Sequence, residues 1–314
     1  MNTLITESND YSAKALEIYK MLGKVTLNAS CEEELIRKLP FAEVLVVRLG
    51  YNLSYDLLKY ASNLKYIVTP TTGLNHIDQD YTQANNIEII SLKGESEFLS
   101  KITPTAELTW GLLLSLLRKI PSATKDVLAN QWNRDAFYGS ELYGRTLGIV
   151  GYGRLGKIIA RYGVAFGMNV LVYDTKIVEP EESIQLSSFD ELLSKADVVS
   201  IHVQLDSTTE EFFDQAAFSK MKYGAVLINT SRGELLCEKS LLASLNNNQL
   251  AGAAVDVLKG ETSSGEWLEN NNLIKYAKQK NNLLITPHIG GACPDSMRRT
   301  EEFVALKLLS LLRA

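Results

Sequence analysis

Cysteine and histidine are both scarce in this chain, since each occurs only three times in 314 residues. The cysteines, Cys31, Cys237 and Cys293, show no C-x-x-C or comparable metal-ligand spacing, which argues against a structural metal site. An odd and low count also argues against a disulfide framework and is typical of a reducing compartment. We therefore predict a cytoplasmic protein whose cysteines act as small apolar side chains and which binds no metal.

Long apolar runs and an excess of basic residues are also lacking. The longest apolar stretch, Trp110 to Leu117, is too short to cross a bilayer, and the first seven residues do not resemble a signal peptide. The net charge is −5, which provides no broad basic surface for nucleic acid or for an anionic membrane. We therefore expect a soluble protein whose partner is a small molecule.

What the chain does contain is an alternation of short apolar runs with helix-period segments, a pattern typical of parallel sheets with crossover helices. Its length suits two domains. The first lobe has candidate strands at 2–6, 24–28, 43–48, 65–69 and 87–92. Helical patterns lie between them at about 10–21, 31–39, 54–61 and 78–85.

The rest of the chain predicts a second lobe of α/β type. Residues 103–120 predict one long helix that is apolar on all sides and therefore buried, either in its own subunit or between subunits. Six strands are predicted at 146–151, 169–173, 198–203, 225–229, 251–256 and 283–286. Six strands with intervening helices fit a doubly wound sheet, and a final helix at about 295–312 could return to the first lobe.

A glycine-rich turn, Gly151-x-Gly153-x-x-Gly156, follows the apolar strand Leu147 to Val150 and opens a helical segment. In this context the first glycine permits a tight turn, the second lets the backbone approach a pyrophosphate, and the third lets helix and strand pack closely. Free N–H groups at the start of the helix would then bind the anion. The predicted cofactor-binding residues are Gly151, Tyr152, Gly153, Arg154, Leu155 and Gly156.

The strand that follows this helix ends in Asp174, 18 residues beyond Gly156. A carboxylate at this position accepts hydrogen bonds from the ribose hydroxyls and repels a 2′-phosphate, so we predict NAD rather than NADP. Thr175 and Lys176 soften this repulsion only in part.

Charged residues follow three further predicted strands of the second lobe. Arg232 lies just past the fourth strand, Asp256 and Glu261 end and follow the fifth, and His288 lies just past the sixth. The carboxyl ends of parallel strands share one edge, where ligands bind in open α/β sheets, so these groups should converge there. Each of these residues alone could have a structural role, and a glutamate in a loop is usually just exposed to solvent. Their occurrence on one edge favours a catalytic role.

Their chemistry fits the reduction of a 2-keto acid. Hydride transfer to the carbonyl carbon produces an alkoxide, and histidine is suited to supply the proton because it titrates near neutral pH. Glu261 would orient the imidazole of His288 and stabilise its charged form. Arg232 would bind the substrate carboxylate with its planar fork, while Asp256 is assigned to the nicotinamide side.

The stretches "LYGRTLGIVGYGRLGKIIA", "ADVVSIHVQL", "MKYGAVLINTSRGELL", "LAGAAVDV" and "ITPHIGG" together resemble the D-isomer-specific 2-hydroxyacid dehydrogenases. The similarity covers nearly the whole chain and is strongest from about Thr103 to Gly291. It implies an Arg-Glu-His catalytic trio at Arg232, Glu261 and His288, with Thr230 among the cofactor-binding residues. The resemblance also implies a homodimer built around the 103–120 helix region.

The same resemblance implies a fold of two Rossmann-like domains. A doubly wound NAD domain, residues 103–291, is inserted into a flavodoxin-like substrate domain made of residues 1–102 and 292–314. Within "LKYIVTPTTGLNHID", N–H groups near Thr72 and Gly73 would hold the substrate carboxylate, and Arg48 matches a position that often faces substrate. Two positions depart from the family pattern, because Gln204 and Thr262 stand where proline is usual.

The expected function is an NAD-dependent oxidoreductase acting on the CH–OH group of a small 2-hydroxy acid, most similar to phosphoglycerate or hydroxypyruvate-type enzymes. Its length leaves no room for an added C-terminal regulatory domain, so we expect no feedback by serine. Two alternatives remain inside the fold: a glyoxylate or D-lactate specialist, and an NADP-preferring glyoxylate or hydroxypyruvate reductase. A third is an NAD-sensing regulatory protein without turnover.

Overall fold

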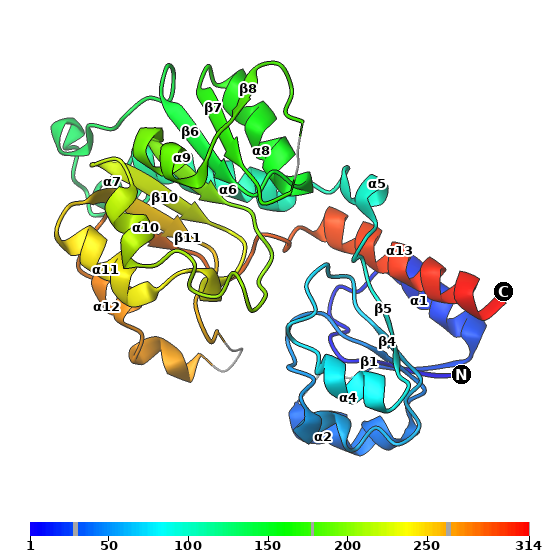
Figure 1. Ribbon diagram of the computed structural model, residues 1–314. Coiled ribbons are helices and arrows are strands. Elements are labelled where there is room, and N and C mark those ends of the chain that lie inside the picture. The colour runs from blue at the N-terminus through cyan, green and yellow to red at the C-terminus, as the bar shows by residue number, and fades with distance from the viewer. Residues whose placement is uncertain (28–30, 177–178, 262–264, 314) are drawn as a thin grey trace. The chain divides into compact units, whose positions relative to one another are not determined.

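The computed structural model describes residues 1–27, 31–176, 179–261 and 265–313, so the predicted loop position Thr262 lies outside the described residues. The chain forms two compact units (Figure 1). Unit 1 comprises Met1–Ile102 and Ala292–Ala314, and unit 2 comprises Thr103–Gly291. Each unit is an α/β structure built on a parallel sheet, which confirms the predicted fold class.

Unit 1 contains a five-stranded sheet with the order β2-β1-β3-β4-β5. Its strands are β1 (Asn2–Ile5), β2 (Lys24–Leu27), β3 (Val44–Val46), β4 (Tyr66–Val68) and β5 (Glu88–Ile90). Its helices are α1 (Ala13–Leu22), α2 (Glu32–Lys38), α3 (Tyr55–Leu58), α4 (Gln79–Ala84), α5 (Ser96–Leu99) and α13 (Pro294–Arg313). All five predicted strands are confirmed, and the central strand β3 is buried throughout because helices cover both faces.

The final helix, α13, belongs to unit 1 although it is separated from the rest of that unit by 189 residues of unit 2, Thr103–Gly291. It packs beside α1, as Figure 1 shows in red and blue. Val304, Ala305 and Leu308 are buried in the same apolar cluster as Ile5 and Tyr19. The predicted return of the last helix to the first lobe is confirmed.

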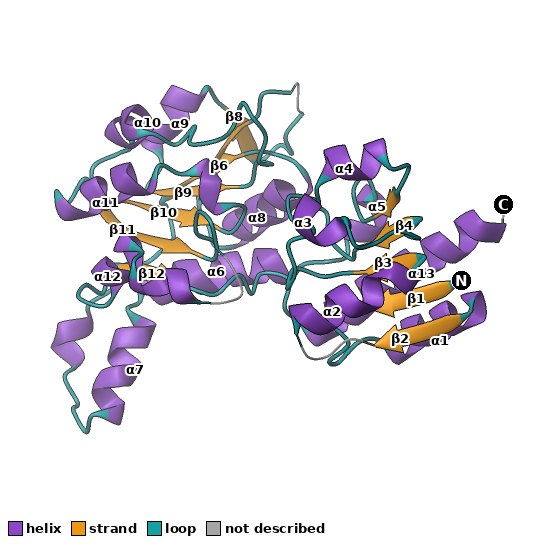
Figure 2. Ribbon diagram, turned by 90° about the horizontal axis from the view of Figure 1, so that it is seen from below, coloured by secondary structure: helices purple, strands orange, loops and turns teal. Residues whose placement is uncertain are grey.

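Unit 2 contains a seven-stranded sheet with the order β12-β11-β10-β9-β6-β7-β8 (Figure 2). Its strands are β6 (Thr146–Val150), β7 (Asn169–Tyr173), β8 (Ile184–Leu186), β9 (Val198–Ile201), β10 (Ala225–Asn229), β11 (Leu250–Val255) and β12 (Leu283–Ile285). Its helices are α6 (Pro104–Leu117), α7 (Ile120–Leu128), α8 (Arg154–Ala165), α9 (Phe189–Lys195), α10 (Gln215–Lys220), α11 (Glu238–Asn246) and α12 (Asn272–Ala277). The six predicted strands are confirmed, and β8 is an additional edge strand in which only Ile184 is buried.

The order of the first six strands in unit 2 reverses between β6 and β9, which lie side by side although β7 and β8 separate them in the sequence. This reversal is the point at which doubly wound sheets bind dinucleotides, just outside the carboxyl ends of the strands. The loops that follow β6, β10, β11 and β12 therefore share one edge of the sheet.

The predicted single helix over 103–120 is wrong in its extent, because the chain breaks at Lys119, whose φ is +53°. Pro121 explains the break: in a continuous helix it would lack an N–H, and its ring would collide with the carbonyl of Leu117. The first piece, α6, packs against α8, β10 and β11 and buries Trp110 and Leu113 inside unit 2. Its apolar character is therefore explained by packing within its own unit.

Candidate active site

The glycine turn lies between β6 and α8, at the strand reversal. Gly151 has φ +96°, a conformation that a side chain makes costly, and a Cβ there would lie 2.5 Å from the carbonyl oxygen of His202. A Cβ at Gly156 would lie 2.1 Å from the oxygen of Gly151, so strand and helix could not approach this closely with any other residue. At Gly153, by contrast, a Cβ would meet no described atom within 4 Å, which leaves this side of the turn open to a ligand.

Asp174 follows β7 and contacts the glycine turn directly. Its Oδ2 accepts a hydrogen bond of 2.8 Å from the N–H of Tyr152, and its Oδ1 accepts one of 2.9 Å from the N–H of Lys176. The carboxylate thus stabilises the turn and remains beside it, at the place predicted for ribose recognition.

His288 lies three residues after β12 and has an unusual backbone, with φ +52°. Its Nδ1 forms a hydrogen bond with Glu261 Oε1, which assigns the Nδ1 proton to the bond with the carboxylate. Its Nε2 hydrogen-bonds to no described residue and is therefore the nitrogen left for a substrate oxygen. The predicted pairing of an imidazole with an acidic partner is present in the structure.

Asp256, at the end of β11, holds the loop that carries His288. Its two carboxylate oxygens accept hydrogen bonds from Thr286 Oγ1 (2.5 Å), Ile289 N (2.9 Å) and Gly290 N (2.7 Å). Its carbonyl oxygen accepts a further bond of 2.8 Å from the N–H of His288. Burial raises the pKa of this carboxyl group above its ordinary value, and the three hydrogen bonds oppose that shift. The sequence assigned Asp256 to the nicotinamide side; in the structure its carboxylate bonds to Thr286, Ile289 and Gly290 of the histidine loop.

Arg232 follows β10 in a loop whose backbone is held by hydrogen bonds to Asn229 and Ile201. Asn229 accepts a bond from Ser231 N and donates one to the carbonyl of Arg232, while Ser231 Oγ bonds to Ile201 O. The guanidinium is half-buried and donates to Ser231 O at 2.7 Å. Burial lowers the pKa of Arg232, and the neighbouring carboxylates of Glu261 and Glu234 oppose the shift.

The loop that carries Glu261 packs closely on the loop after Arg232. A Cβ at Gly233 would lie 2.1 Å from the carbonyl carbon of Leu258, which makes glycine necessary at this contact. Glu261 Oε2 accepts a bond from Leu258 N at 3.1 Å, and Glu238 accepts one from Lys259 N at 3.0 Å. These contacts bring the three predicted catalytic residues together at one edge of unit 2.

The predicted substrate loop lies in unit 1, after β4. Thr71 donates its hydroxyl proton to Gly73 O (2.8 Å), so it must accept from Thr69 Oγ1 at 2.9 Å. Thr69 in turn lies 3.4 Å from His76 Nε2. The N–H groups of Thr72 and Gly73 have no acceptor in the parts of the chain that the structure describes, as a site for a carboxylate requires.

Arg48, the other residue predicted to face substrate, is engaged inside unit 1. Its Nε and Nη2 donate to Glu301 Oε1 at 2.9 and 2.5 Å, and its Nη1 donates to Asn9 O at 3.2 Å. Glu301 lies on α13 and is fully buried, and its other oxygen accepts from Ser12 N. Sequence reasoning missed Glu301, because it lies 253 positions from Arg48 in the sequence.

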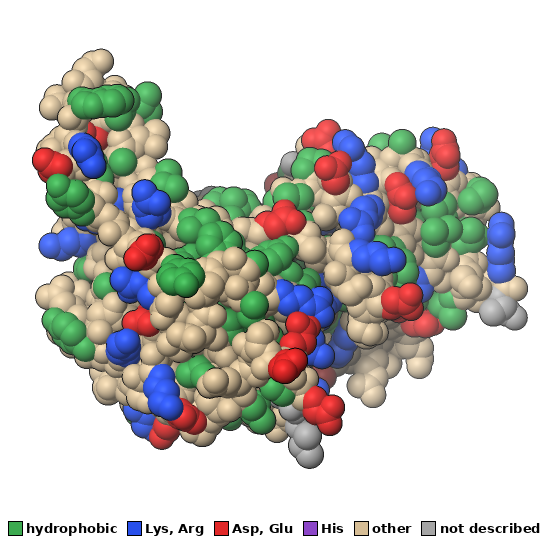
Figure 3. Space-filling model, turned by 90° about the horizontal axis from the view of Figure 1, so that it is seen from above, with side chains coloured by type: hydrophobic (Ala, Val, Ile, Leu, Met, Phe, Trp, Pro, Cys, Tyr) green, Lys and Arg blue, Asp and Glu red, His purple; other side chains and the backbone are tan. Residues whose placement is uncertain are grey.

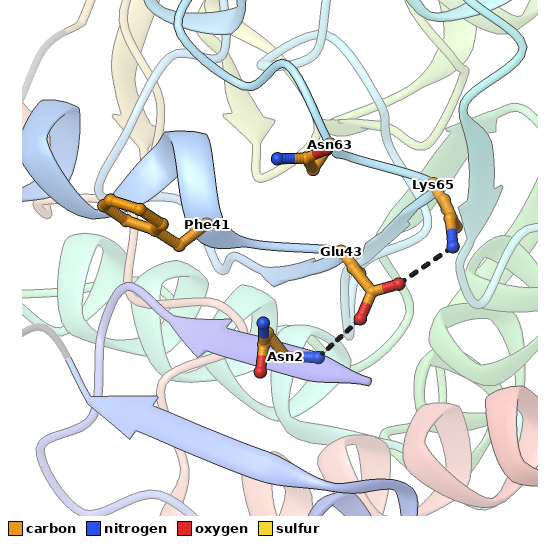
Figure 4. Close-up of a pocket in the computed structure, with 5 residues that line it drawn as sticks. All are labelled: Asn2, Phe41, Glu43, Asn63 and Lys65. Carbon is orange, nitrogen blue, oxygen red and sulfur yellow. Dashed lines mark hydrogen bonds and ion pairs between the residues drawn. The ribbon is translucent and has the colours of Figure 1, made fainter.

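A hollow of about 220 Å³ in unit 1 was not predicted (Figure 4). It lies at the amino ends of β1, β3 and β4, the sheet edge opposite to the one where α/β proteins bind ligands, and is lined by Asn2, Phe41, Glu43, Asn63 and Lys65. Its Glu43 carboxylate is already bonded to Lys65 Nζ and Asn2 N, both drawn as dashed lines. The hollow therefore carries no candidate site, and the candidate active site remains the carboxyl edge of unit 2.

Two family models match this chain. Residues 110–290 match the NAD binding domain, and residues 3–130 match the catalytic domain, of the D-isomer specific 2-hydroxyacid dehydrogenases. The chain belongs to this family. The predicted family and its NAD-binding domain are thereby confirmed. Among the described residues, no cluster of His, Cys, Asp and Glu suited to a metal ion is present, and no helix is long and apolar enough to span a membrane.

Relatives in the family include several dehydrogenases and reductases. The chain is 33% identical over 304 residues to D-3-phosphoglycerate dehydrogenase of Methanocaldococcus jannaschii, covering 95% of this chain and 55% of that protein. It is 30% identical over 295 residues to hydroxypyruvate reductase of Thermotoga maritima, covering 94% and 93%. The chain therefore spans about half the length of the phosphoglycerate dehydrogenase but nearly all of the reductase.

Two solved structures have a similar fold over the whole chain. The TT0316 protein of Thermus thermophilus has a TM-score of 0.84 at 30% identity, covering 100% of this chain and 97% of that one. D-lactate dehydrogenase of Aquifex aeolicus, solved with NAD and lactic acid, has a TM-score of 0.83 at 28% identity, covering 100% and 96%. The fold of this chain is thus similar to that of a D-lactate dehydrogenase solved with NAD.

Proposed function

We propose that this protein is an NAD-dependent D-2-hydroxyacid dehydrogenase. The observation that carries the proposal is the pairing of His288 with Glu261, which leaves Nε2 of His288 for a substrate. This pair lies on the same sheet edge as the glycine turn. Arg232 lies on that edge in a hydrogen-bonded loop and supplies a cation for a carboxylate. These are the groups that reduction of a 2-keto acid requires.

Bound NADH would supply the hydride that reaches C2 of the keto acid. His288 Nε2–H donates its proton to the carbonyl oxygen as negative charge develops there, while Glu261 holds the ring through Nδ1 and stabilises its charged form. Arg232 binds the carboxylate and polarises the adjacent carbonyl. In the oxidative direction neutral His288 accepts the hydroxyl proton at Nε2.

The substrate is proposed to be of the phosphoglycerate or hydroxypyruvate type. The support comes from relatives at 30% identity or more that carry these names and align along nearly the whole chain. We assign the substrate carboxylate to Arg232 of unit 2, and we keep the N–H groups of Thr72 and Gly73 as the predicted substrate-binding groups of unit 1. We assign NAD rather than NADP because the carboxylate of Asp174 lies against the glycine turn.

The test is a kinetic screen of C2 to C4 keto acids with NADH and NADPH, comparing the natural protein with His288→Asn. Asparagine tolerates the positive φ of His288, so the loop should survive the substitution. Removal of the proton donor should lower kcat at least about 100-fold, within the range of general acid–base contributions. The affinity for NADH, measured by fluorescence titration, should be little changed.

The same screen separates the alternatives. Tight NADH binding without turnover of any acid would contradict the proposal and favour an NAD-sensing regulatory protein. Faster turnover with NADPH would favour a glyoxylate or hydroxypyruvate reductase that prefers NADP. A near-natural rate in His288→Asn would refute the role of His288 as the proton donor.

We also propose a cytoplasmic homodimer. The support for the dimer is the segment from Lys119 to Gly139, which projects from unit 2 and exposes apolar side chains, among them Leu128, Trp132 and Tyr138 (Figures 2 and 3). The support for the cytoplasm is that the three cysteines are free thiols.

A further inference from the structure

The first turn of α6 is bonded to the loop that carries His288. Thr105 Oγ1 donates a hydrogen bond of 3.0 Å to the carbonyl oxygen of Gly290. The two residues also pack closely, since a Cβ built on Gly290 would lie 3.2 Å from Thr105 Cγ2. Gly290 lies two residues after His288, so this contact reaches the imidazole's own backbone segment.

A second contact, made by the hydroxyl groups of Thr109 and Thr230, links α6 to the loop of Arg232. Thr109 Oγ1 donates to the carbonyl of Thr105 at 2.7 Å, and it lies 2.9 Å from Thr230 Oγ1. A hydroxyl has one proton, so Thr109 must accept from Thr230. Thr230 precedes Ser231 and Arg232, and both it and Thr109 are buried. One helical turn therefore fastens the segments of two catalytic residues.

The loop of His288 needs such support. A histidine with φ +52° occupies the left-handed region, which is rare for residues other than glycine and persists where the surroundings determine it. Asp256 holds the N–H groups of Ile289 and Gly290 from one side. Thr105 holds the carbonyl of Gly290 and thus restrains the same peptide segment from α6.

We propose that Thr105 is a positioning residue for His288, a deepening of the proposed dehydrogenase function on which this inference rests. Its hydroxyl fixes the loop so that Nε2 keeps its place relative to the substrate carbonyl. Small displacements of a reacting group lower rates steeply, so the loss of this restraint should appear in the chemical step and not in cofactor binding.

The experiment compares Thr105→Val, which replaces the hydroxyl by a methyl group, with Thr105→Ser, which keeps it. Thr105→Val should lower kcat about tenfold, change the NADH affinity less than about twofold, and raise the primary deuterium isotope effect measured with 4-deuterated NADH. Thr105→Ser should recover most of the rate. Thr103→Val is the matched control, because the hydroxyl of Thr103 bonds to Glu107 and not to the histidine loop.

Several outcomes would overturn the inference. Natural kcat in Thr105→Val would do so, and an equally slow Thr105→Ser would show that packing and not the hydroxyl matters. If Thr105→Val does not fold, Thr105→Ala removes the hydroxyl without adding bulk and is judged by the same criteria.

Hydrogen exchange keeps this test separate from that of the proposed function. If the natural protein turns over no keto acid, the dehydrogenase proposal fails by itself. The amides of Ile289 and Gly290 should still exchange several-fold faster in Thr105→Val than in the natural protein, because their loop has lost an anchor. Unchanged exchange would contradict the positioning role.

Discussion

The charge of Asp174 and its hydrogen bonding are two separable properties of one residue. Its carboxylate supports the glycine turn through Tyr152 N and would also repel the 2′-phosphate of NADP. Asp174→Asn removes the charge but can still accept the bond from Tyr152. We expect this variant to keep its NADH activity within a few-fold and to lower KM for NADPH about tenfold or more, equivalent to about 1.4 kcal/mol.

Asp174→Ala is the comparison for that prediction, because it loses both properties. It should relax the discrimination against NADPH as well, but with a larger fall in affinity for either cofactor. If the preference is the same in the natural protein and both variants, another residue must recognise the ribose.

His202 makes stability depend on pH. Burial lowers the pKa of this imidazole to about 3, so inside the folded protein it stays neutral while the unfolded chain takes up a proton below pH ~6.5. As pH falls from about 6.5 towards 3, the unfolded state is therefore favoured, by up to about 1.4 kcal/mol per pH unit. His202→Gln should remove this contribution and show a shallower loss of stability on acidification.

Urea unfolding at several pH values between 4.5 and 7.5 measures how steeply the free energy of unfolding changes with pH in the two proteins. Glu301, whose pKa burial raises, titrates in both proteins and cancels in the comparison. Parallel slopes would mean that the buried imidazole is protonated in the folded state.

At the level of elements, sequence patterns were most informative where one segment carries its own signal. The glycine turn after β6 and the buried strands could be predicted because each depends on contiguous residues and on a period of burial. The convergence of Arg232, Glu261 and His288 could also be predicted, since the carboxyl ends of parallel strands share an edge. The parallel topology of the sheet was enough to predict that these three residues lie close together.

Other elements could not be predicted because their cause is non-local or weak. The edge strand β8 buries one residue and shows no clear alternation. The Arg48–Glu301 and Thr105–Gly290 bonds join residues 253 and 185 positions apart. A single glutamate or threonine in the sequence does not indicate such a bond. The break between α6 and α7 had a local signal in Pro121, which the apolar character of the whole stretch concealed.

At the scale of the whole molecule, a single chain does not explain why α7 and the turn after it expose so many apolar side chains. None of the residues of α7 is buried, and a nine-residue helix is marginally stable in water by itself. Leu128, Trp132 and Tyr138 are 79%, 88% and 68% exposed, a cost that a second copy would remove by covering them. The projecting segment is therefore the surface on which we expect two chains to meet.

A double variant, Leu128→Asp with Trp132→Asp, tests this expectation by placing two like charges in the proposed contact. Sedimentation equilibrium should give about twice the chain mass of 34.9 kDa for the natural protein and a single chain mass for the variant. The matched control is Tyr223→Asp, because Tyr223 is 76% exposed on unit 2 but lies outside the projecting segment, and this variant should remain a dimer. If the double variant stays dimeric, the interface lies elsewhere on the chain. If the natural protein sediments as one chain, the homodimer is excluded.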